Sequence, residues 1–319
     1  MNIKKTVGII ILNYNNYNDT INCINTIEKF NTFPIKYVIV DNGSTNPESV
    51  IKLDEFLRNA FKDKYKKIEE NQPSNILPYV SLLVSHTNDG YARGNNKGLE
   101  LASRDEEIKE ILILNNDVLF VEDTIPTLLA KKSKLKDCAI ISPALYTKDL
   151  SDFDYTCARM APSAWSLIKE CFMLGLNINS YRNVIKQKYW LFIKNPELKQ
   201  KDIIEIEMPS GSCMLIEKKL FKEIGWFDPN TFLYFEENIL FAKIYSRGLK
   251  NYLLPKVSCI HLGASSTKKV ASYFIQRCGL ESRTYYLKTY CKLSVRDKIV
   301  LFISKNIMNS KLFLIKLIK

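Results

Sequence analysis

Several recognition motifs are missing from this sequence of 319 residues, and each absence narrows the class of protein. The eight cysteines form no CxxC pair, which disfavours a zinc knuckle or a dithiol redox motif. No apolar run approaches the roughly 18 residues that a membrane-spanning helix needs. The apolar run at residues 7–12 is too short for the core of a signal peptide. We therefore expect a cytoplasmic protein with reduced cysteines.

Two nucleotide-binding signatures are also missing. The first apolar run ends in Asn13-Tyr-Asn15, where a dinucleotide-binding fold has GxGxxG. The chain also lacks the phosphate-binding sequence GxxxxGK[ST]. These absences argue against an NAD-dependent enzyme and against a P-loop protein.

Basic residues are present in excess, with 46 Lys and Arg against 34 Asp and Glu and a net charge of +12. Such an excess suits anionic partners, including nucleic acids, membrane surfaces and diphosphate substrates. Nucleic acid is the least supported partner, because the basic residues are dispersed and form no recognised nucleic-acid-binding motif. A compositional bias toward lysine explains the overall charge equally well.

Hydrophobic periodicity predicts alternating strands and helices. The expected strands lie at residues 7–12, 37–40, 80–84, 111–114, 212–216 and, as a pair, within 251–260. A first helix is expected to begin at Asp19. Further helices are expected at residues 49–70, 88–103, 124–135, 217–224 and 236–247. This alternation predicts an α/β fold, with a mostly parallel central sheet and helices on both faces.

The strand–helix rhythm breaks twice along the chain. Residues 148–205 hold two helical patterns and no clear strand, and we interpret them as a helical insertion or lid. We expect a catalytic domain at residues 1–267 that contains this insertion, followed by a basic, amphipathic helical region at 268–319. These helices suit an anionic membrane surface, but ordinary helix packing with a solvated basic face explains them too.

Three segments place carboxylates next to apolar runs. Asp41 ends a strand, Asn115-Asn-Asp117 follows another, and Glu236-Glu237 opens a helix. Ligands of open α/β sheets bind outside the carboxyl ends of the strands, so these acids are candidates for a shared site. The pattern indicates an enzyme that uses a nucleotide-activated substrate and a metal ion.

Each candidate has a structural explanation beside the functional one. Asp41 either holds a nucleoside or caps its own turn. Asp117 suits Mg²⁺ or Mn²⁺ but also an ordinary Asn/Asp turn, and His261 suits Mn²⁺ but also a structural role. Glu236 and Glu237 lie among aromatic residues that favour a general base, yet an acid pair also suits a helix N-terminus.

A nucleotide can also be held by polar side chains and by backbone amides at a helix N-terminus. The expected nucleotide-binding residues are Asn13, Asn15, Asp41, Asn88, Gly90, Arg93, Asn95 and Asn116.

The order of these segments along the chain resembles the family 2 glycosyltransferases, especially their rhamnosyltransferase-like and capsular-polysaccharide branch. The resemblance covers about residues 5–267, with gaps at 50–75 and 150–205. It implies a GT-A fold, a nucleotide-sugar donor, Mn²⁺ or Mg²⁺ as cofactor, and inversion at the anomeric carbon.

The resemblance also implies roles for single residues. Asp41 would bind the nucleoside, with Asn13 and Asn15 nearby. Asp117 would be the metal-binding acid of a DxD-like motif, and His261 would be the C-terminal metal and diphosphate ligand. Gly211 and Ser212 would lie beside the donor sugar, and Glu237 would be the catalytic base. Asn115 replaces the first acid of the motif. The base position holds Glu where Asp is commoner, which leaves open whether Glu236 or Glu237 faces the acceptor.

The resulting hypothesis is an inverting glycosyltransferase of bacterial surface polysaccharide synthesis. Its donor would be a UDP- or dTDP-sugar, and its acceptor a lipid-linked saccharide at the inner leaflet. One alternative is a sugar-phosphate nucleotidyltransferase, which the missing glycine-rich signature after Leu12 disfavours. The other is a degenerate nucleotide-sugar-binding assembly subunit without catalysis. The joint presence of Asp41, Asp117, Glu237 and His261 argues against that subunit.

Overall fold

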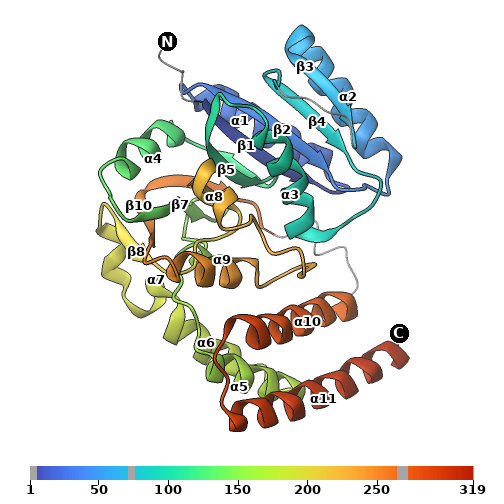
Figure 1. The fold of residues 1–319 in the computed structure, drawn as a ribbon, viewed down its shortest axis with the longest axis vertical. Coiled ribbons are helices and arrows are strands. Elements are labelled where there is room, and N and C mark those ends of the chain that lie inside the picture. Colours follow the sequence, from blue (N-terminus) through green and yellow to red (C-terminus); the bar gives the residue numbers. More distant parts are fainter. Residues whose placement is uncertain (1–5, 71–75, 264–271, 319) are drawn as a thin grey trace.

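The computed structural model describes residues 6–70, 76–263 and 272–318, and its centre is one ten-stranded mixed sheet (Figure 1). The strand order is β3-β4-β2-β1-β5-β9-β7-β10-β6, and β8 pairs with β10 outside this path. The strands are β1 (Thr6–Asn13), β2 (Ile35–Asp41), β3 (Tyr65–Glu69), β4 (Val80–Val84), β5 (Ile108–Asn115), β6 (Val118–Phe120), β7 (Cys138–Tyr146), β8 (Ile204–Ile206), β9 (Cys213–Glu217) and β10 (Lys250–His261).

Helices cover both faces of this sheet and form a further layer beside it. The helices are α1 (Tyr17–Phe30), α2 (Pro47–Phe61), α3 (Gly90–Ser103), α4 (Thr124–Lys132), α5 (Ala164–Gly175), α6 (Tyr181–Tyr189), α7 (Leu191–Lys194), α8 (Lys218–Glu223), α9 (Glu236–Tyr245), α10 (Ser272–Tyr290) and α11 (Val295–Ile318). Short 3₁₀ turns are η1 (Lys62–Lys64), η2 (Tyr155–Cys157) and η3 (Pro196–Gln200).

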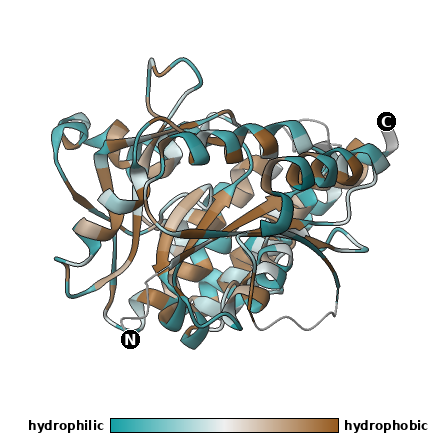
Figure 2. Cartoon of the chain, turned by 90° about the horizontal axis from the view of Figure 1, so that it is seen from above, coloured by the Kyte–Doolittle hydropathy of each residue, from teal (hydrophilic) through white to brown (hydrophobic). Residues whose placement is uncertain are grey.

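The apolar strands are buried on both faces, as their continuous hydrophobic runs predict. Successive side chains of a strand point to opposite faces, so β1 places Ile9 and Ile11 in one core cluster and Ile10 in the other. Helices α1, α2 and α4 contribute to the first cluster, and α3, α8 and α9 to the second. Figure 2 shows hydrophobic strands at the centre and helices of mixed character around them. Each buried isoleucine contributes roughly 1.5–3 kcal/mol to folding.

The predicted α/β class with helices on both faces is confirmed, and the sheet is more mixed than expected. Strands β1, β2, β4 and β5 are parallel neighbours. Strand β9 runs antiparallel between β5 and β7, and β6 and β8 each pair antiparallel with β10. The sequence analysis did not predict β3, β6, β7 or β8.

Two predicted elements are corrected by the structure. The helix expected at residues 49–70 ends at Phe61, because Lys62 adopts a left-handed conformation with φ of +49°. Residues Tyr65–Glu69 then form β3, parallel to β4. The strand pair expected within residues 251–260 is the single strand β10, whose pairing with β7 is interrupted between Leu254 and Ser258. Pro255 lies in this interruption and has no amide hydrogen to donate.

The insertion and the C-terminal helices form one helical layer beside the sheet (Figure 1). Leu167 of α5, Leu287 of α10 and Leu301 of α11 share a buried cluster with Ile239 of α9. Helix α9 therefore joins this layer to the sheet domain. Whether residues 268–319 behave as a separate region stays a prediction.

Candidate active site

A cavity of about 610 Å³ lies at the carboxyl ends of β1, β2 and β5. These are the strand ends at which the sequence predicted a ligand site. The cavity wall also includes residues of the insertion, of the loop before β9, of α9 and of the end of β10. Of the predicted site residues, Asn88, Gly90, Asn116, Asp117, Ser212, Glu237 and His261 line it.

Sheet register brings Asp117 and His261 together. In the antiparallel pair β10–β6, His261 lies opposite Val118, the residue after Asp117. As a result, His261 Nε2 is 3.4 Å from Asp117 Oδ1. Ser212 Oγ is 3.3 Å from the same nitrogen. An oxygen and a nitrogen ligand therefore stand side by side on one wall of the cavity.

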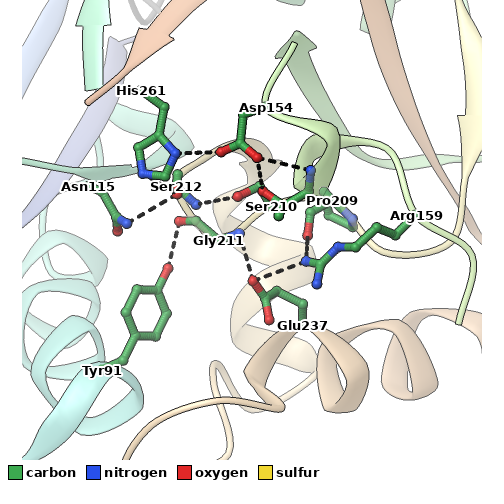
Figure 3. A network of polar contacts seen from close by, with 11 residues as sticks. Tyr91, Asn115, Asp154, Arg159, Pro209, Ser210, Gly211, Ser212, Glu237 and His261 are labelled. Atoms are coloured by element: carbon green, nitrogen blue, oxygen red, sulfur yellow. Dashed lines mark hydrogen bonds and ion pairs between the residues drawn. The ribbon is translucent and has the colours of Figure 1, made fainter. Parts of the chain in front are cut away.

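Asp154, which the sequence analysis missed, holds the other side of the imidazole ring (Figure 3). Its Oδ2 is 2.6 Å from His261 Nδ1, and its Oδ1 accepts hydrogen bonds from Thr156 N and Oγ1. Burial lowers the pKa of His261, but hydrogen bonds to Asp117 and Asp154 and their charges outweigh burial and raise it to about 9. The carboxylate of Asp154 orients the ring so that Nε2 faces Asp117.

This arrangement fits a divalent ion that is shared with a substrate. Mg²⁺ and Mn²⁺ are commonly held by one or two protein carboxylates together with substrate phosphates and water, and Mn²⁺ also accepts imidazole nitrogen. Asp117 and His261 would supply such a partial set of ligands, and His261 would have to release its Nε2 proton to do so. Within residues 6–70, 76–263 and 272–318, no group of three or more His, Cys, Asp or Glu side chains is arranged to hold a metal ion.

Glu237 and Glu236 occupy different environments. Glu237 faces the cavity, where its Oε1 accepts a hydrogen bond of 3.1 Å from Gly211 N and lies 3.3 Å from Arg159 Nη2. Glu236 points inward and is 5% exposed. Burial and the charge of Glu237 raise the pKa of Glu236 to about 8. Glu237, and not Glu236, therefore faces the cavity.

The turn before α9 produces this division. Tyr234 and Phe235 both adopt left-handed conformations, with φ of +73° and +70°. Non-glycine residues rarely adopt this conformation, and when they do they are often found at functional sites. The turn starts α9 so that its first residue is buried and its second faces the cavity.

The Gly211–Ser212 loop connects the two acidic sites (Figure 3). Gly211 N donates to Glu237, and Gly211 O accepts a hydrogen bond of 2.7 Å from the Tyr91 hydroxyl. A Cβ at Gly211 would lie 2.8 Å from that hydroxyl oxygen and 3.3 Å from Glu237 Oε1. Ser212 then contacts His261. Any larger residue at position 211 would displace the Tyr91 hydroxyl and crowd the Glu237 carboxylate.

Three predicted nucleotide-binding residues, Asn13, Asp41 and Asn95, are buried and do not line the cavity. The register of β1 and β2 pairs Asn13 with Asp41. Asp41 accepts hydrogen bonds from Asn13 Nδ2 at 2.7 Å and from Ser44 N and Oγ at 3.0 and 2.6 Å. Asn95 donates to Tyr91 O within α3. The carboxylate of Asp41 thus caps the turn after β2, and its role as a nucleoside ligand stays a prediction.

Other predicted nucleotide-binding residues are divided between the cavity and its surroundings. Asn88 and Gly90 line the cavity, and Gly90 has φ of +78°; a Cβ at Gly90 would lie 2.1 Å from the Phe232 carbonyl oxygen. Asn15 contacts the Thr45–Asn46 segment. Arg93 donates to Pro229 O and lines a separate, smaller pocket.

Sequence reasoning missed several residues of the cavity wall: Tyr14, Asn42, Asp154, Thr156, Arg159 and Ser210. Asn42 lies in the recognised turn after β2. Its side-chain amide donates hydrogen bonds to Asn88 Oδ1 and to Gly90 O, and only the three-dimensional structure shows these contacts. Asp154 and Arg159 lie in the insertion, where no motif marks them.

Comparison with protein families finds a match to the model described as Glycosyl transferase family 2, over residues 8–225. The chain is 24% identical over 250 residues to N-acetylglucosaminyl-diphospho-decaprenol L-rhamnosyltransferase of Mycobacterium tuberculosis, covering 73% of this chain and 68% of that protein. It is 22% identical over 233 residues to the low-salt glycan biosynthesis hexosyltransferase Agl10 of Haloferax volcanii, covering 72% of this chain and 59% of that protein.

Two solved structures share the fold. GalNAc-T7 with UDP, GalNAc and Mn²⁺ has a TM-score of 0.56 and 14% identity, covering 81% of this chain and 44% of that chain. The mannosyltransferase PcManGT of Pyrobaculum calidifontis, in complex with GDP-Man and Mn²⁺, has a TM-score of 0.51 and 14% identity, covering 94% and 69%. These likenesses confirm the expected GT-A fold.

Proposed function

The chain belongs to glycosyl transferase family 2, and we propose that this glycosyltransferase inverts the anomeric carbon of its donor sugar with the help of a divalent ion. The observation that carries the proposal is that Asp117, His261 and Glu237 line one cavity and are linked through the Gly211–Ser212 loop. The proposed general base and the proposed site for the leaving diphosphate are therefore neighbours.

Glu237 acts as the base in this proposal. Its carboxylate takes the proton of an acceptor hydroxyl while the hydroxyl oxygen bonds to the anomeric carbon. The bond from that carbon to the diphosphate oxygen breaks in the same step, so the configuration inverts. Arg159 and the Gly211 amide hold Glu237 Oε1, which fixes the direction of the carboxylate.

The leaving diphosphate belongs at Asp117 and His261. A divalent ion bound there would supply positive charge for the departing group. Asp154 orients His261, and Ser212 adds a hydroxyl at the same nitrogen. Holding both substrates in one cavity contributes further to the rate.

We propose a UDP- or dTDP-sugar as donor and a lipid-linked saccharide as acceptor, in bacterial surface polysaccharide synthesis. The mycobacterial relative is named for an L-rhamnosyl group and a diphospho-decaprenol acceptor, which supports an acceptor of this class. The nucleotidyltransferase and non-catalytic alternatives are not favoured, because the family and the named relatives are glycosyltransferases.

We also propose that the protein works at the inner face of the membrane. No helix in the described ranges combines the length and apolar character that crossing a bilayer requires. Helix α11 exposes Ile299, Phe302 and Phe313 among its lysines. Apolar side chains beside cations are typical of helices that lie on anionic lipid.

A donor screen tests the proposed reaction. The purified protein is incubated with UDP-, dTDP- and GDP-sugars, with and without Mn²⁺, and a lipid-linked acceptor. We expect metal-dependent transfer from UDP- or dTDP-sugars, and a product whose anomeric configuration, measured by NMR, is opposite to that of the donor. Retained configuration, or full transfer in a chelator, would overturn the mechanism.

A further inference from the structure

A second cavity, of about 810 Å³, adjoins the first. It is enclosed by α5 and α6 of the insertion and by α10 and α11 of the C-terminal region. Arg159, Tyr234, Glu237 and Ile275 line both cavities. Glu237 therefore stands at the junction, where a group bound in the second cavity can reach it.

The charge of this second cavity is unbalanced. Its wall carries five cationic and two anionic side chains. Both anions are paired, since Glu237 faces Arg159 and Glu170 Oε2 lies 2.9 Å from Arg283 Nη2. The three remaining cations are Arg182, Lys186 and Lys311, and no ion pair joins them to a carboxylate within the described residues.

These three cations lie where two elements meet. Arg182 and Lys186 are four residues apart on α6, so they share one face of the helix. Lys311 of α11 donates to Leu174 O at 2.6 Å. Burial and the charge of Arg182 lower the pKa of Lys311. An anion bound between α6 and α11 would relieve the repulsion.

The rest of the wall is apolar. Buried side chains from four elements border the cavity: Leu167, Leu174, Ile185, Leu280 and Met308. Trp190 adds an aromatic face, over which Lys186 Nζ lies 5.0 Å from the ring centroid. A site with a cationic cluster and an apolar wall suits a ligand that has a phosphate group and a hydrocarbon tail.

We propose that this second cavity binds the acceptor, with Arg182 and Lys186 holding the diphosphate of its lipid and the apolar wall contacting the first part of the hydrocarbon tail. The assignment rests on the proposed function, in which the acceptor is a lipid-linked saccharide. It adds the place of binding and the residues that select a charged lipid over a neutral one.

Direct binding tests the assignment without turnover. Farnesyl diphosphate is the probe, titrated calorimetrically in a phospholipid-free neutral detergent. Farnesol and inorganic pyrophosphate are titrated separately as the tail and the charge alone. We expect farnesyl diphosphate to bind at least tenfold more tightly than either fragment.

Two double variants test which cationic side chains bind the diphosphate of the probe. Arg182→Gln/Lys186→Gln should weaken binding of farnesyl diphosphate roughly tenfold or more, because charge-assisted hydrogen bonds are lost. Lys169→Gln/Lys188→Gln is the matched control, since it removes equal charge from α5 and α6 outside the cavity wall. Equal weakening by both pairs, unchanged binding in the first pair, or farnesol binding as tight as farnesyl diphosphate would overturn the proposal.

Turnover separates this proposal from the function on which it rests. In the active enzyme, the first pair should raise KM for a diphosphate-linked acceptor while KM for the donor stays unchanged. A protein that binds the probe through Arg182 and Lys186 but transfers no sugar would contradict the proposed function and leave the cavity assignment intact.

Discussion

At the scale of single residues, two adjacent glutamates have opposite surroundings. Glu237 faces both cavities with its carboxylate held by Arg159 and by the Gly211 amide. Glu236 is buried, and its Oε1 has no hydrogen-bond partner within the described residues. A buried carboxyl group without full hydrogen bonding favours its neutral form. The structure separates the pair that the sequence left ambiguous.

Glu236→Gln should stabilise the protein at alkaline pH and leave transfer largely intact. The pKa of Glu236 is about 8 in the folded protein against a reference value of 4.5, so the folded state holds this proton more tightly. The parent therefore loses stability as pH rises from about 4.5 through 8. Glutamine removes that loss, and we expect a gain of roughly 4 kcal/mol at pH 8 and little change at pH 4.5. Urea unfolding at a series of pH values measures it, and a pH-independent difference would contradict the assignment.

Asp154→Asn should weaken metal binding more than it weakens folding. Asp154 contacts His261 Nδ1 and does not contact a substrate in the proposed mechanism, so it is a positioning residue. Loss of such a partner typically costs 10–100-fold in metal affinity or activity. We expect the Mn²⁺ concentration for half-maximal activity to rise by about tenfold while saturating Mn²⁺ restores most of kcat. The exposed Asp149→Asn is the control, and an equal shift in both variants would refute the role of Asp154.

At the scale of elements, the strands were predictable and several connections were not. Strands β1, β2, β4 and β5 are buried on both faces, so their sequences are continuous apolar runs. Strand β3 lies at the sheet edge, and only its Ile68 is buried, so it has no apolar run. The charged helical pattern before it continued into its sequence and concealed where the strand begins. The place of Asp154 could not be predicted, because its contact with His261 spans 107 positions across an insertion without a motif.

The Gly211 loop offers a test in which two substitutions should interact. Gly211→Ala places a Cβ 2.8 Å from the Tyr91 hydroxyl oxygen and 3.3 Å from Glu237 Oε1, so either side chain must shift. We expect the rate of transfer to fall about 100-fold, as misplacement of a catalytic group by about 1 Å can cost. Adding Tyr91→Phe removes the closer obstacle and should recover part of this loss. Additive losses in the double variant would contradict the steric explanation.

At the scale of the whole molecule, the helical layer performs two proposed tasks. It encloses the second cavity beside Glu237, and its α11 exposes apolar side chains away from the core. Removing α11 would test neither task cleanly, because Leu301, Met308 and Leu312 pack against α5 and α10. Surface substitutions are the better probe.

Phe302→Ser/Phe313→Ser should reduce binding to anionic membranes without unfolding the protein. Phe302 is 69% exposed and Phe313 61% exposed, so the core loses little. In co-sedimentation with vesicles that contain phosphatidylglycerol, we expect the bound fraction to fall several-fold. Ile51→Ser/Tyr245→Ser is the control, with two similarly exposed side chains on α2 and α9. Equal binding by both variants and the parent would remove α11 from membrane contact.

We propose Glu237 as the base of a glycosyl transfer whose leaving group is held at Asp117 and His261. The decisive experiment is to measure the transfer rate of Glu237→Gln at saturating Mn²⁺, donor and acceptor. We predict a fall of about 10²–10⁴-fold with largely unchanged donor affinity, because a general base contributes that much and a glutamine oxygen can still accept the hydrogen bond from Gly211 N. A Glu237→Gln protein that transfers sugar at the rate of the parent would contradict the account.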